Sequence, residues 1–187
     1  MDLTMPLPKT VTVSGKKVPI RTGFRSWLLF DKALASEEIP FAKRLAMAFS
    51  AVLVDKELPD DFGALIEALL SFYACGKTKA FSKNGEKRVL SFSHDGDLIY
   101  AAFLSQYGVD LTRKNPHWYA FCAMLSGLSS HQVLSKIITY RSVNLSEIEN
   151  KAQRKFYQKM KARYRLPDNR TAQTIEQDTA NALSLLI

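Results

Sequence analysis

Two carboxylates flank a glycine in Asp95-Gly96-Asp97, just before a run of aliphatic and aromatic residues. A loop of this kind can bind a metal ion or a phosphate, or it can be the first turn of a helix. A calcium loop of the EF-hand type needs more oxygen ligands at alternate positions and a glutamate twelve residues along, and a P-loop ends in Gly-Lys-Ser/Thr. Neither pattern follows these residues. The stretch therefore favours a helix start capped by Ser93 or Asp95, with Asp97 in the first turn, and we predict no metal and no cofactor.

Three histidines and two cysteines are the other candidates for chemistry. His117 and Cys122 are five positions apart in one predicted helix, so they lie on different faces, and no third residue is placed to orient a histidine base. A partly buried histidine and a core cysteine are the simpler interpretation, while His94 and His131 lie near predicted helix starts as surface or capping residues. Cys75 and Cys122 form neither a CxxC pair nor a metal-type spacing with the histidines. Because no GxSxG, HExxH or glycine-rich phosphate loop occurs either, we expect no enzymatic activity.

A basic helix near the C-terminus is the strongest remaining candidate for function. Residues 145–165 are predicted to form one long helix that begins after an Asn144 cap and ends before Pro167. Residues 151–170 carry eight basic groups and one acidic group. Four cations recur in this helix at every fourth position without an acid between them: Lys151, Lys155, Lys159 and Arg163.

These four cations, which we call the basic column, have an energetic cost in the isolated helix. Like charges four residues apart repel by about 0.2–0.5 kcal/mol per pair. A solvated face is one interpretation of the column, but the lack of interleaved acids favours contact with an acidic partner, either a protein or a nucleic acid. One position further along runs an apolar column that we expect to dock on the protein core: Ile148, Ala152, Phe156, Met160 and Tyr164.

These candidates must be positioned by a fold that is predicted to be mainly α, with a short N-terminal β-hairpin. The 187 residues are 47% hydrophobic and 24% charged, as expected of one globular domain. Residues 10–21 alternate apolar and polar side chains around a Ser14-Gly15 turn, and Pro19 restricts the second strand to a sheet edge. From Phe24 onward apolar residues recur at spacings of three and four, which predicts a multi-helix globular domain.

We predict a single helical domain over residues 1–167 and a C-terminal helical appendage over residues 168–187. The appendage has too little apolar surface to be stable alone. Residues 77–90 are polar and basic, and the pattern is compatible with either a loop or a small hairpin. Helix ends are indicated by residues with known terminal preferences: Pro40 and Pro116 in first turns, Asn115 as an N-cap, and Gly76, Gly108 and Gly127 at C-termini.

No segment indicates secretion or membrane insertion. The first ten residues lack the charged and apolar regions of a secretory signal. The longest nearly apolar run, residues 45–54, is about half of the length that a bilayer-spanning helix needs. Together with the cysteine pattern, these features predict a soluble protein of a reducing compartment, without a membrane partner.

Several segments resemble one family of phage proteins. They are "VTVSGKKVPIRTGFRSWLLFD", "SFSHDGDLIYAAFLSQYGVDL", "HWYAFCAMLSGL" and "KIITYRSVNLSEIENKAQRKFYQKMKARYRLP", which occur in this order between residues 10 and 167. They resemble the phage gene-product-fifteen family of long-tailed phages infecting Gram-positive bacteria. The most specific parts of the resemblance are residues 99–103, residues 107–111 and His117-Trp118. Family members usually have tryptophan where Tyr119 stands and often arginine where Cys122 stands.

The resemblance implies a tail-morphogenesis protein that is encoded by a phage or prophage, between the tube protein and the tape measure, and acts in the host cytoplasm. Its implied role is that of a tail assembly chaperone, which coats the long helical tape-measure protein, keeps it soluble and recruits tube subunits. The implied partners are the tape-measure protein and the major tail tube protein, with self-association as a further expectation. The family has no known catalytic residues.

The partner contact predicted for such a chaperone combines aromatic anchors with the basic column. A helical binder can hold a guest helix in an apolar groove, and Trp27, Trp118, Tyr119 and Phe121 are large enough to line it. We predict that Trp118, Tyr119 and the basic column contact the partner. The alternative function is that of a small basic nucleic-acid-binding protein using the 145–165 helix, although no helix-turn-helix or zinc pattern surrounds that helix.

Overall fold

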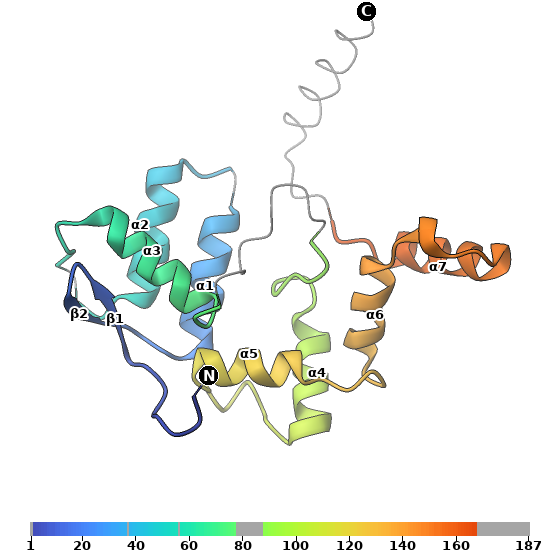
Figure 1. The fold of residues 1–187 in the computed structure, drawn as a ribbon, viewed down its shortest axis with the longest axis horizontal. Helices are drawn as coiled ribbons and strands as arrows, with labels where there is room; N and C mark the ends of the chain where they lie inside the picture. Colours follow the sequence, from blue (N-terminus) through green and yellow to red (C-terminus); the bar gives the residue numbers. More distant parts are fainter. Residues whose placement is uncertain (1, 37, 56, 78–87, 168–187) are drawn as a thin grey trace, which may run out of the picture.

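The computed structural model describes residues 2–36, 38–55, 57–77 and 88–167. Within this part of the chain, seven α-helices and one two-stranded antiparallel hairpin form the fold, which confirms the predicted mainly α class (Figure 1). None of these helices is long and apolar enough to cross a membrane. The predictions for the basic segment around residues 78–87 and for the appendage at 168–187 concern positions outside the described residues.

The N-terminal hairpin lies where the sequence predicts it. Strand β1 (Thr10–Val13) pairs antiparallel with β2 (Lys16–Pro19). The connecting residues Ser14 and Gly15 both have positive φ, 46° and 80°, as a two-residue hairpin turn requires. The alternation along β1 then turns one of its faces inward, so that Val13 is buried in the core.

Three helices pack around the hairpin: α1 (Phe24–Ala35), α2 (Phe41–Val52) and α3 (Phe62–Tyr73). Helix α1 packs along α2, and α3 lies against β1. The Asp61 carboxylate caps α3 by accepting a hydrogen bond from the Ala64 amide at 3.0 Å, and it accepts another from the Ser14 hydroxyl at 2.7 Å. It therefore joins the start of a helix to the hairpin turn. Pro40 is the N-cap of α2, one position before its predicted place, and Gly76 lies in the turn after α3.

Four further helices form the other side of the molecule: α4 (Gly96–Tyr107), α5 (Trp118–Ser126), α6 (Val133–Ser142) and α7 (Lys151–Arg163). Gly108 ends α4 in the left-handed region at φ 63°, and Gly127 ends α5, as predicted. The predicted start of α5 is wrong. Its N-cap is His117 rather than Asn115, because the imidazole Nδ1 accepts a hydrogen bond from the Tyr119 amide at 3.1 Å.

A core of aromatic side chains joins the two sides. Trp27 of α1 and Trp118 of α5 are 0% and 2% exposed, and their rings stack with centroids 6.4 Å apart. Both indole N–H groups donate to backbone carbonyls, Trp27 to Arg21 at 2.9 Å and Trp118 to Tyr73 at 2.8 Å. The other buried rings of this core belong to Phe24, Phe30, Phe49, Phe72, Phe103 and Phe121. Helices from both sides of the molecule therefore share one hydrophobic core.

The long helix predicted for residues 145–165 is in fact two elements. A 3₁₀ turn covers Leu145–Glu147, and α7 begins later, with the Asn150 side chain as its N-cap. Asn144 caps only the short turn. The backbone is extended at Ile148, so the helix is interrupted between two asparagine caps.

Helix α7, which we call the basic arm, projects from the body of the protein beyond α6 (Figure 1). None of its residues is buried, so the expected docking of its apolar column on the core is wrong. The column packs on α6 instead. Tyr164 stacks on Tyr140 with centroids 5.9 Å apart, and Phe156 meets the same ring edge-on at 6.1 Å. Phe156 is still 49% exposed, so part of this apolar face remains in contact with solvent.

Candidate partner-binding surfaces

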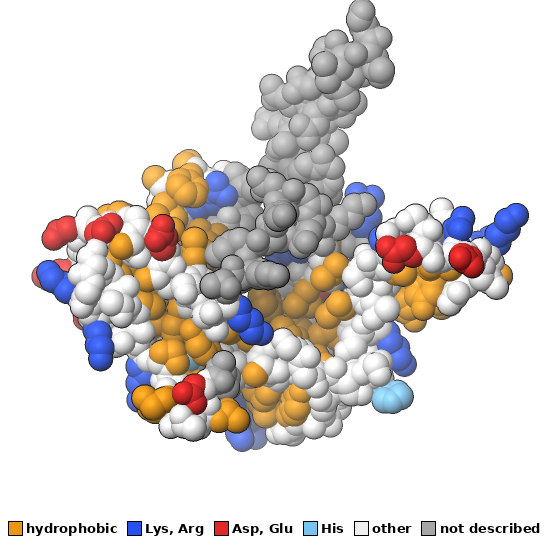
Figure 2. Space-filling view, viewed as in Figure 1, with side chains coloured by type: hydrophobic (Ala, Val, Ile, Leu, Met, Phe, Trp, Pro, Cys, Tyr) orange, Lys and Arg blue, Asp and Glu red, His pale blue; other side chains and the backbone are white. Residues whose placement is uncertain are grey.

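The basic arm presents the predicted basic column to solvent. Its four cations are all exposed, and within the described residues none of them forms an ion pair. Figure 2 shows basic side chains at the outer end of the arm. Two other cations of the helix are engaged by the backbone: Lys161 donates to the carbonyl of Val143 at 2.6 Å, and Arg154 donates to that of Ile148. These two side chains fasten the arm, whereas the column is available to a partner.

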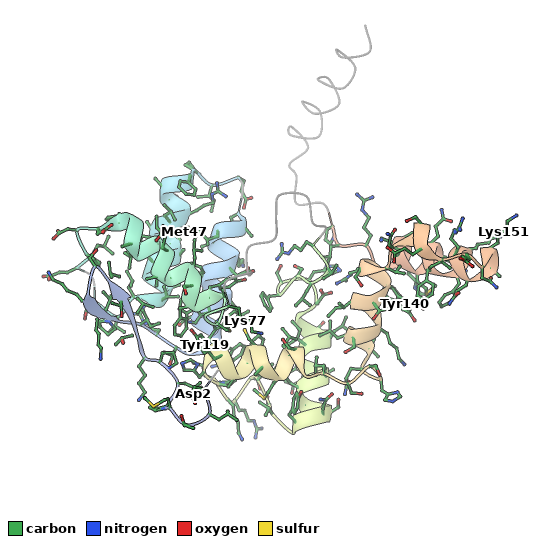
Figure 3. All side chains as sticks on the ribbon, in the orientation of Figure 1. Asp2, Met47, Lys77, Tyr119, Tyr140 and Lys151 are labelled. Atoms are coloured by element: carbon green, nitrogen blue, oxygen red, sulfur yellow. The ribbon has the colours of Figure 1, made fainter. Side chains whose placement is uncertain are left out.

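The two predicted aromatic contacts lie elsewhere. Trp118 is enclosed in the core, so its predicted place in a partner contact is corrected to a structural role. Tyr119 is half-buried, with its ring centroid 4.7 Å from that of Phe72. Figure 3 shows Tyr119 at the start of α5 and Lys151 far from it on α7. The residues predicted to contact a partner therefore do not form one surface.

Two thiols that are unrelated by sequence spacing come together beside Tyr119. Cys75 follows α3 in the left-handed region, at φ 57°, and its thiol interacts with that of Cys122 on α5. This interaction, and then burial, raises the pKa of Cys122, while the same interaction lowers the pKa of Cys75. Burial, and then the two thiols, raises the pKa of Tyr119 to about 12. The Cys122 thiol and the Tyr119 phenol are therefore neutral at physiological pH.

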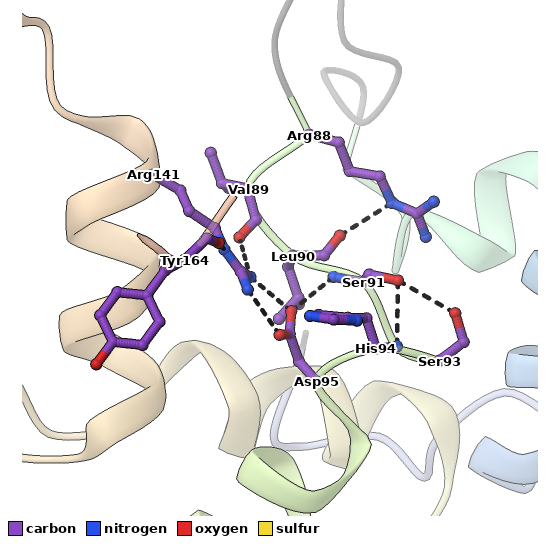
Figure 4. A network of polar contacts seen from close by, with 9 residues as sticks. All are labelled: Arg88, Val89, Leu90, Ser91, Ser93, His94, Asp95, Arg141 and Tyr164. Atoms are coloured by element: carbon purple, nitrogen blue, oxygen red, sulfur yellow. Dashed lines mark hydrogen bonds and ion pairs between the residues drawn. The ribbon is translucent and has the colours of Figure 1, made fainter. Parts of the chain in front are cut away.

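A buried ion pair positions the basic arm (Figure 4). Asp95 and Arg141 are 1% and 7% exposed and form two parallel hydrogen bonds of 2.7 and 2.9 Å. Arg141 also donates through Nε to the carbonyl of Tyr164 at 2.6 Å, and through Nη1 to that of Val89 at 3.1 Å. One guanidinium group thus connects the start of α4, the end of α7 and the segment that precedes α4.

This pair corrects the predicted role of Asp95. The residue is at the N-cap position of α4, but its side chain makes no capping hydrogen bond. It accepts instead from the Ser91 amide at 2.9 Å and from Arg141. Burial by itself raises the pKa of Asp95, but the hydrogen bonds from Arg141 and Ser91 and the charge of Arg141 outweigh burial, so that the pKa is below its ordinary value of 3.8. The carboxylate is therefore ionised at neutral pH, and Asp97 alone is the acidic residue of the first helical turn.

A groove lined by both apolar and charged side chains, which no sequence pattern indicates, runs along α1. It has a volume of about 780 Å³ and is formed by α1 together with residues 88–93. Two carboxylates line it, and one of them, Asp31, pairs with Arg88 at 3.7 Å. The apolar lining residues and the cations beside them are Leu28, Leu29, Ala35 and Phe92, with Arg25, Lys32 and Arg88. We call this hollow the α1 groove.

The α1 groove adjoins a basic cleft at Arg88. This second hollow has a volume of about 1400 Å³ and lies between the end of α6 and the end of α7. Its charged lining residues are all cations within the described part of the chain: Arg88, Arg141, Lys161 and Arg165. Because Arg88 lines both hollows, an apolar contact surface and a basic one are contiguous there.

The three histidines have no partners for metal binding in the described part of the chain, where no group of three or more His, Cys, Asp or Glu side chains is placed to hold an ion. His117 uses both ring nitrogens: Nδ1 caps α5, and Nε2 donates to the carbonyl of Pro8 at 2.9 Å. The imidazole thus fastens α5 to the N-terminal segment. His94 and His131 are exposed, as predicted.

Comparison with known proteins gives one match. A family model described as Bacteriophage Gp15 protein matches residues 3–166, a range that includes the hairpin and all seven described helices. The α1 groove and the basic arm both lie within it. No curated protein and no solved structure matches the chain.

Proposed function

The chain belongs to the Bacteriophage Gp15 protein family, and on that premise we propose that it is a chaperone of phage tail assembly. Membership in the family makes it a phage protein and supports a structural or morphogenetic role. In this proposal the protein acts in the host cytoplasm, binds the tape-measure protein and helps to recruit subunits of the major tail tube protein. These two partners follow from the resemblance described above.

The observation that carries the proposal is the α1 groove with its adjoining basic cleft. A tape-measure protein is a long helical chain, and exposed apolar stripes on such a chain aggregate. An amphipathic guest helix can place side chains at i, i+3, i+4 and i+7 into an apolar groove. Leu28, Leu29 and Phe92 provide the apolar contact, while Lys32 and Arg88 face acidic residues that flank the stripe of the guest.

The basic arm provides a second contact, for acidic groups. Its column has no interleaved acid, so an acidic partner relieves the repulsion between the four cations and is steered toward them. We assign this contact to a protein rather than to nucleic acid, because the neighbouring groove combines apolar side chains with two carboxylates, a lining that does not favour a polyanion. In this proposal the α1 groove binds the helical guest, and the basic arm binds an acidic surface of a protein.

Leu29→Glu tests the groove most directly. The change places a charge in the apolar lining at a side chain that is 58% exposed, so the fold should tolerate it. The wild type and the variant are each co-expressed with the tape-measure protein encoded by the same phage genome. We expect the soluble tape measure recovered with the variant, by pull-down and by a solubility assay, to fall severalfold.

Val133→Glu is the matched control. Val133 on α6 is also 58% exposed, and it does not line the groove. It should therefore recover as much soluble tape measure as the wild type. Equal recovery with both variants would contradict the groove as the binding site. Binding to random duplex DNA that falls steeply with salt, without any tape-measure binding, would support the nucleic-acid function instead.

A further inference from the structure

A mainly basic surface and a mainly acidic one lie at opposite ends of the molecule. The basic arm carries six cations and no acid. Residues 55–61, which we call the acidic turn, connect α2 to α3 and carry four carboxylates and one lysine. Figure 1 places the α2–α3 connection and α7 at opposite ends of the long axis. Figure 2 shows mostly acidic side chains, with some basic ones, at the first end, and basic side chains at the tip of the arm with acidic ones close beside them. The acidic groups next to the arm include the exposed Glu147 and Glu149, which precede α7.

The acidic turn is also bordered by exposed apolar side chains. Val54, Leu58 and Phe62 are 49%, 43% and 47% exposed. Together with the hairpin, the turn encloses a hollow of about 860 Å³. Lys16 and Lys17 line the hairpin side of this hollow, and the carboxylates line the other side. The charges of the hollow are therefore arranged asymmetrically.

Three carboxylates of the acidic turn have no counter-ion in the described part of the chain. Asp61 is used internally, by the Ala64 amide and the Ser14 hydroxyl. Asp55, Glu57 and Asp60 are exposed and form no ion pair among the described residues. These three groups can therefore receive cations from another molecule.

The basic arm is complementary in charge to the acidic turn and its hollow. Phe156 is 49% exposed and is adjacent in sequence to Lys155, so an aromatic side chain lies beside the basic column. An aromatic anchor next to cations fits a hollow whose lining combines apolar side chains with carboxylates. The hairpin lysines repel the column, and this repulsion defines on which side of the hollow the arm lies.

We infer that the basic arm docks on the acidic turn of a second copy of this chain. This inference rests on the proposed function and deepens it, because it names the acidic partner of the arm. The arm and the turn are at opposite ends of one molecule, so the contact is head-to-tail and leaves each copy with a further arm or turn to offer. Contacts of this kind build rings or helical filaments. The α1 groove of each copy is a separate surface and stays available to a guest helix.

The test is sedimentation velocity of the purified full chain without other proteins, across concentration and salt. We expect concentration-dependent association that weakens as salt increases, because exposed charges are screened. Lys155→Glu with Lys159→Glu reverses the arm, and Glu57→Lys with Asp60→Lys reverses the turn. Each reversed protein should raise the Kd of self-association by at least about tenfold, since like charges then meet in the contact.

Mixing the two reversed proteins provides the decisive measurement. The native arm of the turn-reversed protein meets the native turn of the arm-reversed protein. The two carboxylates introduced into the other arm meet the two lysines introduced into the other turn. Association should therefore return in the mixture although each protein alone is monomeric. Lys114→Glu with Lys136→Glu is the matched control for the reversed arm, because both lysines are exposed, lie outside the arm and give the same change in net charge as the arm reversal. This control should associate like the wild type.

Three outcomes would overturn the inference: a wild type that is monomeric at low salt, reversed proteins that still associate, or a mixture that does not. Circular dichroism of each variant verifies that it is folded. If the wild type is monomeric and the arm-reversed protein no longer binds the tape-measure protein, then the arm contacts the tape measure and not a second copy. The Leu29→Glu experiment is unaffected by any of these results, so the proposed function and this inference fail separately.

Discussion

At the scale of single residues, Arg141 determines how the basic arm is held. Its guanidinium group bonds to the Asp95 carboxylate and to the backbone carbonyls of Val89 and Tyr164. Their sequence separations from Arg141 are 46, 52 and 23 residues, too long for any local pattern to reveal. A charge this deeply buried is retained only where its hydrogen bonds are satisfied, and here four of them are.

Replacing Arg141 with methionine should destabilise the protein by about 3–5 kcal/mol, because the Asp95 carboxylate is then buried without its cation. Urea unfolding followed by circular dichroism measures this. Arg113→Met is the control, because Arg113 pairs with Asp110 at the surface and its side chain is 88% exposed. That change should leave the unfolding midpoint where it is. Equal effects of the two substitutions would contradict a dominant role for the buried pair.

The same pair predicts a loss of stability in acid. The pKa of Asp95 in the folded protein is below the ordinary value of 3.8, which the unfolded chain has. The pair therefore stabilises the fold at pH values above 3.8, and this contribution is lost as the pH falls through the folded pKa. The difference in unfolding free energy between the wild type and Asp95→Asn should be largest near neutral pH and shrink below about pH 4. A difference independent of pH would show that the carboxylate is not the titrating group.

Residue-scale predictions from the sequence succeeded for surface charge and failed for buried groups. The four cations of the basic column are exposed, because the spacing of the helix places no acidic residue where it could pair with them in a buried site. Aspartate before a helix is a typical N-cap, so the sequence predicts a capping role for Asp95, whereas its actual partner, Arg141, is distant in sequence. Trp118 has the same helical spacing whether it lies in a core or in a groove, so only the three-dimensional packing assigns it to the core.

At the scale of elements, boundaries were predictable where one residue decides them. The hairpin and the end of α4 depend on positive φ at Gly15 and Gly108, which glycine adopts without strain. The start of α7 was not predictable, because Asn144 and Asn150 are both good N-caps and the sequence does not say that each begins its own element. The α1 groove was not predictable either, since its second wall, residues 88–93, is far from α1 in sequence.

The contact between α1 and α5 depends on a close approach at Gly23. The Trp118 amide donates to the carbonyl of Thr22 at 2.7 Å, which brings the start of α5 against the start of α1. A Cβ atom at Gly23 would lie 2.3 Å from the Asn115 side-chain nitrogen. The backbone of Gly23 has φ of −66°, which alanine also adopts, so steric contact is the obstacle there.

Gly23→Ala should therefore lower stability by about 0.5–1.5 kcal/mol, because the exposed Asn115 side chain must move out of its preferred conformation to make room for the added methyl group. Adding Asn115→Ala should restore part of the loss, since the side chain that clashes is removed. Thermal unfolding of the single and double variants measures the coupling between the two positions. Simple additivity of the two changes would contradict the steric explanation.

At the scale of the whole molecule, the core and the two charged ends have separate roles. Trp27 and Trp118 join the helices of both sides in one hydrophobic core. The basic arm lies outside that core and is held through Arg141 and Tyr140. Because the α1 groove, the arm and the acidic turn are different surfaces, a copy can hold a guest helix while its two ends contact neighbouring copies.

Hydrogen exchange should accordingly divide the protein into a slow core and a fast arm. Helices α1 and α5 contribute Trp27 and Trp118 to one core, so their amides should exchange together, at the rate of global unfolding. Helix α7 buries no residue, so its amides should exchange through local opening, with much lower protection. Peptide-resolved mass spectrometry measures both in dilute protein. At concentrations where copies associate, protection of α7 and of the acidic turn should rise, while that of α1 and α5 should not change. Separate exchange of α1 and α5 would contradict a shared core. An arm as protected as the core in dilute protein would mean that α7 is not an exposed docking element.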